Sequence, residues 1–150
     1  MSQTRQIIPA AGLLATMAAA VYMVVQLSAQ TATASADFTN AALAEVRDAQ
    51  GQVLLRGQFQ LADEEDDDIE RKAVLAPTGV DADAGGEAEV EFSKDAPATQ
   101  EVEFSVRNIP PGAVLTFAID GADVATATVD ARGRAGIELD VRMPGAAAAR

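Results

Sequence analysis

Residues 87–93 read Glu-Ala-Glu-Val-Glu-Phe-Ser, and residues 100–107 read Gln-Glu-Val-Glu-Phe-Ser-Val-Arg. Apolar and polar side chains alternate in both, which is typical of a β-strand with one face on a core and the other in water. A hairpin around Pro97 would place Glu91 opposite Glu103. Like charges directly across strands destabilise a sheet by up to about 1 kcal/mol. The glutamates therefore indicate an exposed face screened by salt, strands that are not neighbours, or an anionic strip that meets a cation or a basic partner.

The same alternation recurs on both sides of these two stretches. Further strands are predicted over 42–47, 53–61, 69–76, 113–119, 122–129 and 134–141. Gly57 falls on the apolar face of its strand, which suggests a bulge or a close approach of backbones. Helix competes with strand only over 40–46, where alanine is frequent. About seven or eight strands predict an all-β fold, an antiparallel immunoglobulin-like sandwich or a partly open barrel, preceded by an N-terminal hydrophobic helix.

The predicted hairpin 113–129 differs from the others because neither of its faces is strongly polar. Asp120-Gly121 joins its two strands, and this dipeptide is a strong signal for a tight turn. A central strand that is covered on both faces has this composition. An edge strand that is used for self-association has it too.

The first 36 residues have the layout of a secretory signal peptide. Arg5 precedes an apolar run from Ile7 to Leu27, and the segment ends with Ala34-Ser35-Ala36. This order predicts cleavage before Asp37. The apolar run is also long enough to remain as an uncleaved membrane anchor, the one arrangement in which membrane contact is expected. Either way the remainder is expected to be exported, to the periplasm, the cell surface or the medium, as one β-sandwich domain over 37–145 with a flexible tail over 146–150.

Charge and composition exclude several classes of function. Removing residues 1–36 takes away only Arg5 and leaves 10 basic and 23 acidic residues, a net charge of −13. Such acidity argues against nucleic acid and anionic membranes, and it suits cations or a basic protein partner. The chain has no cysteine, histidine or tryptophan. Ser-His-Asp, Cys-His and histidine-ligated metal chemistry are therefore absent, and no enzyme is expected; a carboxylate-based hydrolase is the chemistry that remains.

Two acidic segments are the candidate metal sites, since calcium binds several carboxylate oxygens. The first is the run of Asp63, Glu64, Glu65, Asp66, Asp67 and Asp68. The second begins with Asp81 and Asp83 and resembles the start of an EF-hand loop, but it has Phe92 where that loop has its last ligand. The alternative for both is a solvated loop in which like charges repel. Calcium is thus the only cofactor that the sequence suggests.

The candidate interaction face is carried by the two alternating strands. It consists of Glu89, Glu91, Glu101 and Glu103. The partner expected there is a basic protein, whereas self-association is expected through an edge strand.

Residues 106–135 resemble a family of uncharacterised exported bacterial β-sandwich domains. The shared pattern is P-P-G … D-G … D-x-x-G-x-A, carried here by Pro110-Pro111-Gly112, Asp120-Gly121 and Asp130 to Ala135. The chain departs from it with Asn108-Ile109 in place of Gly-Leu and with Leu115 in place of an aromatic residue. The resemblance implies a small immunoglobulin-like or related sandwich and supplies no catalytic residue. The sequence thus predicts an exported, acidic, non-enzymatic binding or structural module, with a calcium-stabilised extracellular domain as the alternative.

Overall fold

The computed structural model describes residues 36–64, 68–93 and 99–144, and every strand pairing in it is antiparallel. It contains nine strands and no helix in this part of the chain, which confirms the all-β prediction. The strands are β1 (Leu43–Arg47), β2 (Val53–Gln58), β3 (Gln60–Glu64), β4 (Asp68–Pro77), β5 (Gly85–Ser93), β6 (Thr99–Arg107), β7 (Val114–Ile119), β8 (Ala122–Thr128) and β9 (Ala135–Arg142).

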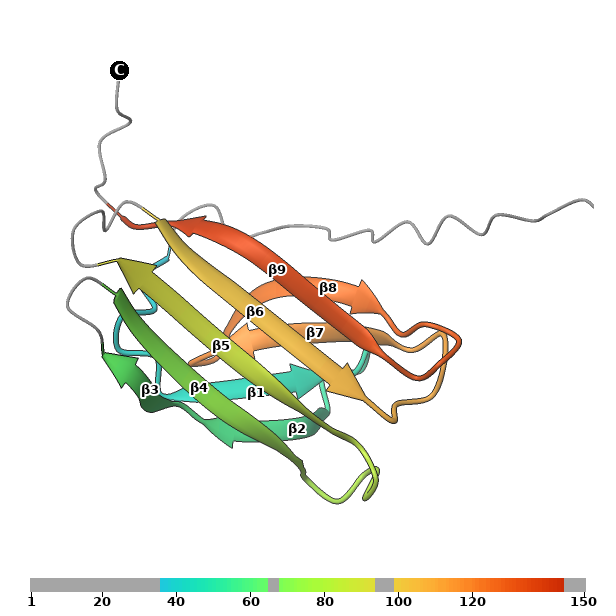
Figure 1. Ribbon diagram of the computed structural model, residues 1–150. Helices are drawn as coiled ribbons and strands as arrows, with labels where there is room; N and C mark the ends of the chain where they lie inside the picture. Colours follow the sequence, from blue (N-terminus) through green and yellow to red (C-terminus); the bar gives the residue numbers. More distant parts are fainter. Residues whose placement is uncertain (1–35, 65–67, 94–98, 145–150) are drawn as a thin grey trace, which may run out of the picture.

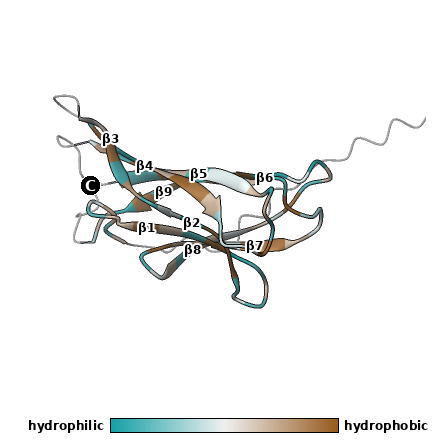
Figure 2. Cartoon of the chain, turned by 90° about the horizontal axis from the view of Figure 1, so that it is seen from below, coloured by the Kyte–Doolittle hydropathy of each residue, from teal (hydrophilic) through white to brown (hydrophobic). Residues whose placement is uncertain are grey.

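The strands form two packed layers that are joined along one side (Figure 1). One layer has the order β8-β7-β1-β2, and the other has the order β3-β4-β5-β6-β9. Figure 2 shows β4, β5 and β6 lying over β1, β2, β7 and β8. Two backbone pairs, Leu55 with Pro77 and Arg56 with Ala76, connect β2 to β4. The result is a nearly closed antiparallel sheet folded into a flattened barrel, whose end strands are β8 and β9.

The predicted strand 53–61 is in fact two strands, because the chain changes layer at Phe59. β2 pairs with β1, whereas β3 pairs with β4 in the other layer. Gly57 makes this crossing feasible: a Cβ atom there would overlap the backbone carbonyl of Val74. The close approach predicted for Gly57 is therefore confirmed. Any larger residue would push β2 away from β4.

The core lies between the two layers and is built from the inward residues of both. Phe104 on β6 and Phe117 on β7 pack with ring centroids 5.1 Å apart. Residues 43–46 of the segment 40–46, where helix competed, lie in β1 between β2 and β7, with Ala44 and Val46 fully buried. Pairing on both edges satisfies the backbone of this segment, so tertiary context overrides the helix propensity of alanine. In the hairpin 113–129, β7 is central and β8 is the outer strand.

The register between β5 and β6 differs from the predicted one by two residues. Glu91 lies opposite Glu101, and Glu89 lies opposite Glu103, so the predicted pairing of Glu91 with Glu103 is wrong. Alternation assigns each residue to a face, but a slip of two residues preserves every face. The residues that connect the two strands, 94–98, lie outside the described residues.

The N-terminal and C-terminal predictions fall largely outside the described residues. The predicted signal or helix within residues 1–36 is described only at Ala36, and the tail 146–150 is not described. No helix within residues 36–64, 68–93 and 99–144 is long and apolar enough to cross a membrane.

A carboxylate-covered sheet face as the candidate functional site

The outer face of the β4-β5-β6-β9 layer carries a row of acids in register across four strands. Because facing residues of an antiparallel ladder share a face, the cross-strand pairs define this row directly. It consists of Glu70, Glu91, Glu101 and Asp140. Adjacent strands are about 4.8 Å apart, so the row places one carboxylate at each such step. We call it the first row.

A second row lies two residues further along each strand on the same face. It consists of Lys72, Glu89, Glu103 and Glu138. Lys72 pairs with Glu70 and, at 3.5 Å, with Glu89. The two rows hold seven carboxylates (Glu70, Glu91, Glu101, Asp140, Glu89, Glu103, Glu138) and one cation, and together we call them the glutamate face. The four residues predicted for the interaction face all belong to it.

Protonation on the glutamate face reflects this crowding. Partial burial, together with the nearby Glu70 carboxyl, raises the pKa of Glu89 to about 7, although Lys72 opposes the rise. Burial and then the charges of Glu138, Glu91, Asp140 and Glu103 raise the pKa of Glu101. A hydrogen bond from Lys72 and another from Glu89 hold the pKa of Glu70 below its usual value. Near neutral pH, therefore, Glu89 is partly protonated and donates to Glu70.

Glu87 lies on the same side of β5, outside the two rows. Its neighbours across the ladders are Val74 on β4 and Ser105 on β6, so no acid faces it directly. Glu87 is exposed. It is therefore the natural reference for effects that depend on the crowding of carboxylates.

The outer face of the opposite layer is electrically balanced. Glu45, with a side chain only 8% exposed, binds Arg47 and Arg56 at 2.6 Å each, and Arg47 also binds Asp123 at 3.1 Å. The hydrogen bond from Arg47 is the main reason that the pKa of Glu45 lies below its usual value. Sequence reasoning missed this network, although Glu45 and Arg47 alternate on one strand. The excess of acid is thus concentrated on one of the two layers.

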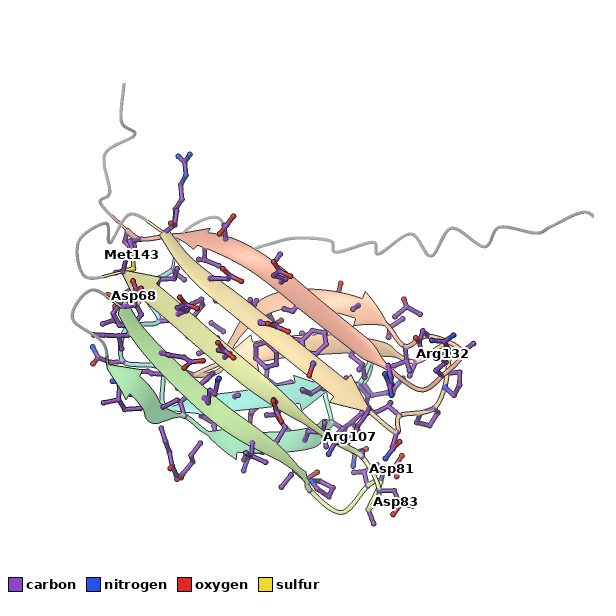
Figure 3. The ribbon with its side chains drawn as sticks, viewed as in Figure 1. Asp68, Asp81, Asp83, Arg107, Arg132 and Met143 are labelled. Atoms are coloured by element: carbon purple, nitrogen blue, oxygen red, sulfur yellow. The ribbon has the colours of Figure 1, made fainter. Side chains whose placement is uncertain are left out.

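The two predicted metal clusters lie at opposite ends of β4 (Figure 3). Asp68 pairs with Ser93 at the start of β4, whereas Asp81 and Asp83 follow its end in the connection to β5. A ten-residue strand separates these ends by about 30 Å. In the first cluster, Asp63 and Glu64 belong to β3, and 65–67 lie outside the described residues.

The described residues contain no group of three or more acids, histidines or cysteines with the geometry of a metal site. Asp81 instead accepts a backbone hydrogen bond from Asp83 at 3.4 Å, as an aspartate in a turn does. The acids that the fold brings together in rows are those of the glutamate face.

One hollow of about 510 Å³ lies where β2 and β3 diverge from β4. It is lined by Arg56, Gly57, Gln58, Gln60, Leu61, Ala62, Lys72 and Val74. Its lining contains no Asp or Glu, so this hollow offers no pair of carboxylates of the kind that a glycosidase uses.

Comparison of the chain with protein-family models, with curated proteins and with solved structures found no match.

Proposed function

We propose that this protein is an exported, acidic, non-enzymatic β-domain that binds a basic partner through the glutamate face. The observation that carries the proposal is the in-register stacking of carboxylates across four strands. Its place of action is the periplasm, the cell surface or the medium, as the layout of residues 1–36 predicts. Within this proposal the fold belongs to the immunoglobulin-like sandwiches, which is supported by its two antiparallel layers around one core.

The facing carboxylates of the glutamate face destabilise the fold, which supports a role in binding cations and not a role in stabilising the sheet. Each carboxylate that faces another across a ladder destabilises the sheet by a few tenths to about 1 kcal/mol. A partner that presents Lys or Arg side chains removes this repulsion when it binds. The field of the face also accelerates the encounter with such a partner at low ionic strength.

A lysine decapeptide labelled with a fluorophore tests the proposal, with the full chain held in nonionic detergent. The variant Glu91→Gln/Glu101→Gln/Glu103→Gln removes three charges from the glutamate face. The matched control, Asp68→Asn/Asp81→Asn/Asp83→Asn, removes three charges from the ends of β4. We expect at least a tenfold weaker affinity for the first variant and less than a threefold change for the control, measured by anisotropy in 50 mM salt. If both variants lost affinity equally, the interaction would depend only on net charge, and a specific binding face would be contradicted.

Calcium stabilisation is the alternative function. Among the described residues no group of three or more acids has the geometry of a metal site, so its support is limited to pairs of facing carboxylates. Hard cations take carboxylate oxygens, and Glu91 and Glu101 lie directly opposite each other. The two functions differ in ion selectivity, because a diffuse anionic face responds alike to calcium and magnesium whereas a built calcium site does not.

A further inference from the structure

One side of the folded sheet remains open, between its end strands. In the described part of the chain, β9 has a ladder with β6 along one edge and no ladder along the other. β8 lies next to this second edge without pairing with it. The described contact there is a single hydrogen bond from the Ala36 amide to the Arg142 carbonyl, 3.1 Å long, at the very end of the strand. Among the described residues, the second edge of this eight-residue strand thus has no ladder partner.

The core is incompletely covered along the same side. The apolar side chains that pack against the core while staying partly exposed include Ala135 and Leu139 of β9 and Ala127 of β8. Their inward neighbours Ile137 and Val141 are buried. Another strand laid along β9 would bury the exposed parts of Ala135 and Leu139 and add to the hydrophobic stabilisation.

Both rows of the glutamate face end on this strand. Glu138 closes the second row and Asp140 closes the first, and both are exposed. A strand added beside β9 would bring two of its own side chains directly opposite these carboxylates, about 6.7 Å apart along the strand. Opposite charges in such cross-strand positions stabilise the pairing.

We propose that the open edge of β9 binds an extended segment of the basic partner as an additional strand. In this arrangement the basic residues of the segment face Glu138 and Asp140. The apolar residues that alternate with them cover Ala135 and Leu139. This rests on the proposed function and specifies the form of the partner. Binding by strand addition combines backbone hydrogen bonds with an alternating side-chain pattern.

The fold disfavours two other ways to occupy a sheet edge. If two copies paired antiparallel through β9 with the register centred on Leu139, Glu138 of one copy would face Asp140 of the other, which is unfavourable. The outer edge of β3 is short, five residues, and its sequence ends in Asp63 and Glu64, the kind of charged edge that discourages pairing. The edge of β9, which carries Glu138 and Asp140, is therefore better suited to a basic strand than the edge of β3.

Two peptides of identical composition test the inference, one alternating Lys and Val over eight residues and one with four Lys followed by four Val. We expect the alternating peptide to bind the full chain in detergent at least tenfold more tightly at 150 mM salt. Equal affinities would overturn strand addition and leave the proposed function standing. If the lysine decapeptide and both octapeptides fail to bind, the proposed function itself is wrong.

Two variants with the same added charge locate the site. Leu139→Lys places a cation at the open edge, whereas Val74→Lys places one at a residue that is 77% exposed on β4. We expect Leu139→Lys to lower the affinity for the alternating peptide at least tenfold and Val74→Lys to lower it less than threefold. Hydrogen exchange of the unmodified protein is the second readout: the peptide should slow the amides of 135–142 and leave those of 60–64 unchanged. Protection at 60–64 instead would overturn the assignment to β9.

Discussion

Glu91 lies directly opposite Glu101, and Asp140 continues their row on the far side of Glu101. Glu101 is thus flanked by an acid on each neighbouring strand, and the pKa of its carboxyl is raised by burial and by these charges. When the first row is ionised, repulsion between Glu101 and its two neighbours lowers the stability of the fold.

Replacing Glu101 by lysine should therefore stabilise the fold. Glu101→Lys turns two repulsive cross-strand pairs into attractive ones, and we expect about 1 kcal/mol higher free energy of unfolding in low salt. The control Glu87→Lys changes the charge equally, but residue 87 faces Val74 and Ser105. The free energy of unfolding should therefore rise less than half as much as for Glu101→Lys. Urea unfolding in 20 mM and 1 M NaCl checks this. Because concentrated salt screens the row, a gain that persists undiminished in 1 M NaCl would contradict the mechanism.

Stability should pass through a maximum as the pH falls. The pKa of Glu89 is about 7 in the folded chain, above its ordinary value of 4.5, so between these values the folded state binds more protons than the unfolded state. The free energy of unfolding should rise by about 1 kcal/mol from pH 8 to pH 5, since solvent screens part of the effect at this half-buried site. Below about pH 4.5 it should fall, because the pKa values of Glu45 and Asp37 are lowered in the fold.

Glu89→Gln should remove most of the rise between pH 8 and pH 5 and leave the part that the raised pKa of Glu101 contributes, whereas Glu87→Gln should keep the whole rise. Urea unfolding at pH 8, 6.5, 5 and 3.5 measures both variants. A profile for Glu89→Gln that still rises as the wild type does would assign the effect to another group.

Gly57→Ala should destabilise the fold by about 1–3 kcal/mol. The added methyl group meets the backbone of Val74, which cannot rotate away as a side chain could. Gly85→Ala is the control, because its Cβ would lie 3.7 Å from the Leu75 carbonyl oxygen, an ordinary contact. Thermal unfolding compares the two, and equal melting temperatures would show that β2 and β4 can separate without cost.

Gln100→Leu should lower the free energy of unfolding by about 1–3 kcal/mol. Gln100 is 1% exposed, and its Oε1 accepts a hydrogen bond from the Phe38 amide at 2.8 Å, while its Nε2 donates to the sulfur of Met143. Leucine would leave the Phe38 amide without this partner. Gln58→Leu, at an exposed position of β2, should change stability by less than about 0.5 kcal/mol. If both variants unfold at the same urea concentration, the contact to Phe38 contributes nothing.

Calcium and magnesium at equal millimolar concentrations should raise the melting temperature by the same small amount. The two predicted acidic clusters are held apart by β4, so neither adds ligands to the other. Asp81→Asn/Asp83→Asn should leave both shifts unchanged. A rise of several degrees with calcium alone, abolished by a chelator, would favour the calcium-stabilised alternative.

The alternation of polar and apolar residues predicted the strands well, but not the register between them. Residues 87–93 and 100–107 form β5 and β6 as expected, since the pattern depends only on which face meets the core. The pairing of Glu91 with Glu101 depends on a turn, and the break in 53–61 depends on the Val74 backbone, which no local pattern encodes. The network around Glu45 was missed because the sequence of β1 does not show that Arg56 of β2 lies opposite Glu45.

The candidate site could be predicted in its residues but not in its extent. Glu89, Glu91, Glu101 and Glu103 were found from two strands alone. Glu70, Glu138 and Asp140 join them only because β4 and β9 lie beside those strands, a fact of topology that a single sequence does not contain.

The pairing of β1 with β7 spans most of the domain, with Ala44 opposite Ile119. Strands so distant in sequence pair late in folding, because the entropy cost of closing a long loop comes before any stabilising contact forms. Topologies of this kind fold slowly. β1 cannot complete its ladder with β7 until residues 114–119 have been synthesised. The layer that contains β1 and β7 therefore stays incomplete until late in synthesis, which would suit passage of the chain through a translocation channel in the proposed export.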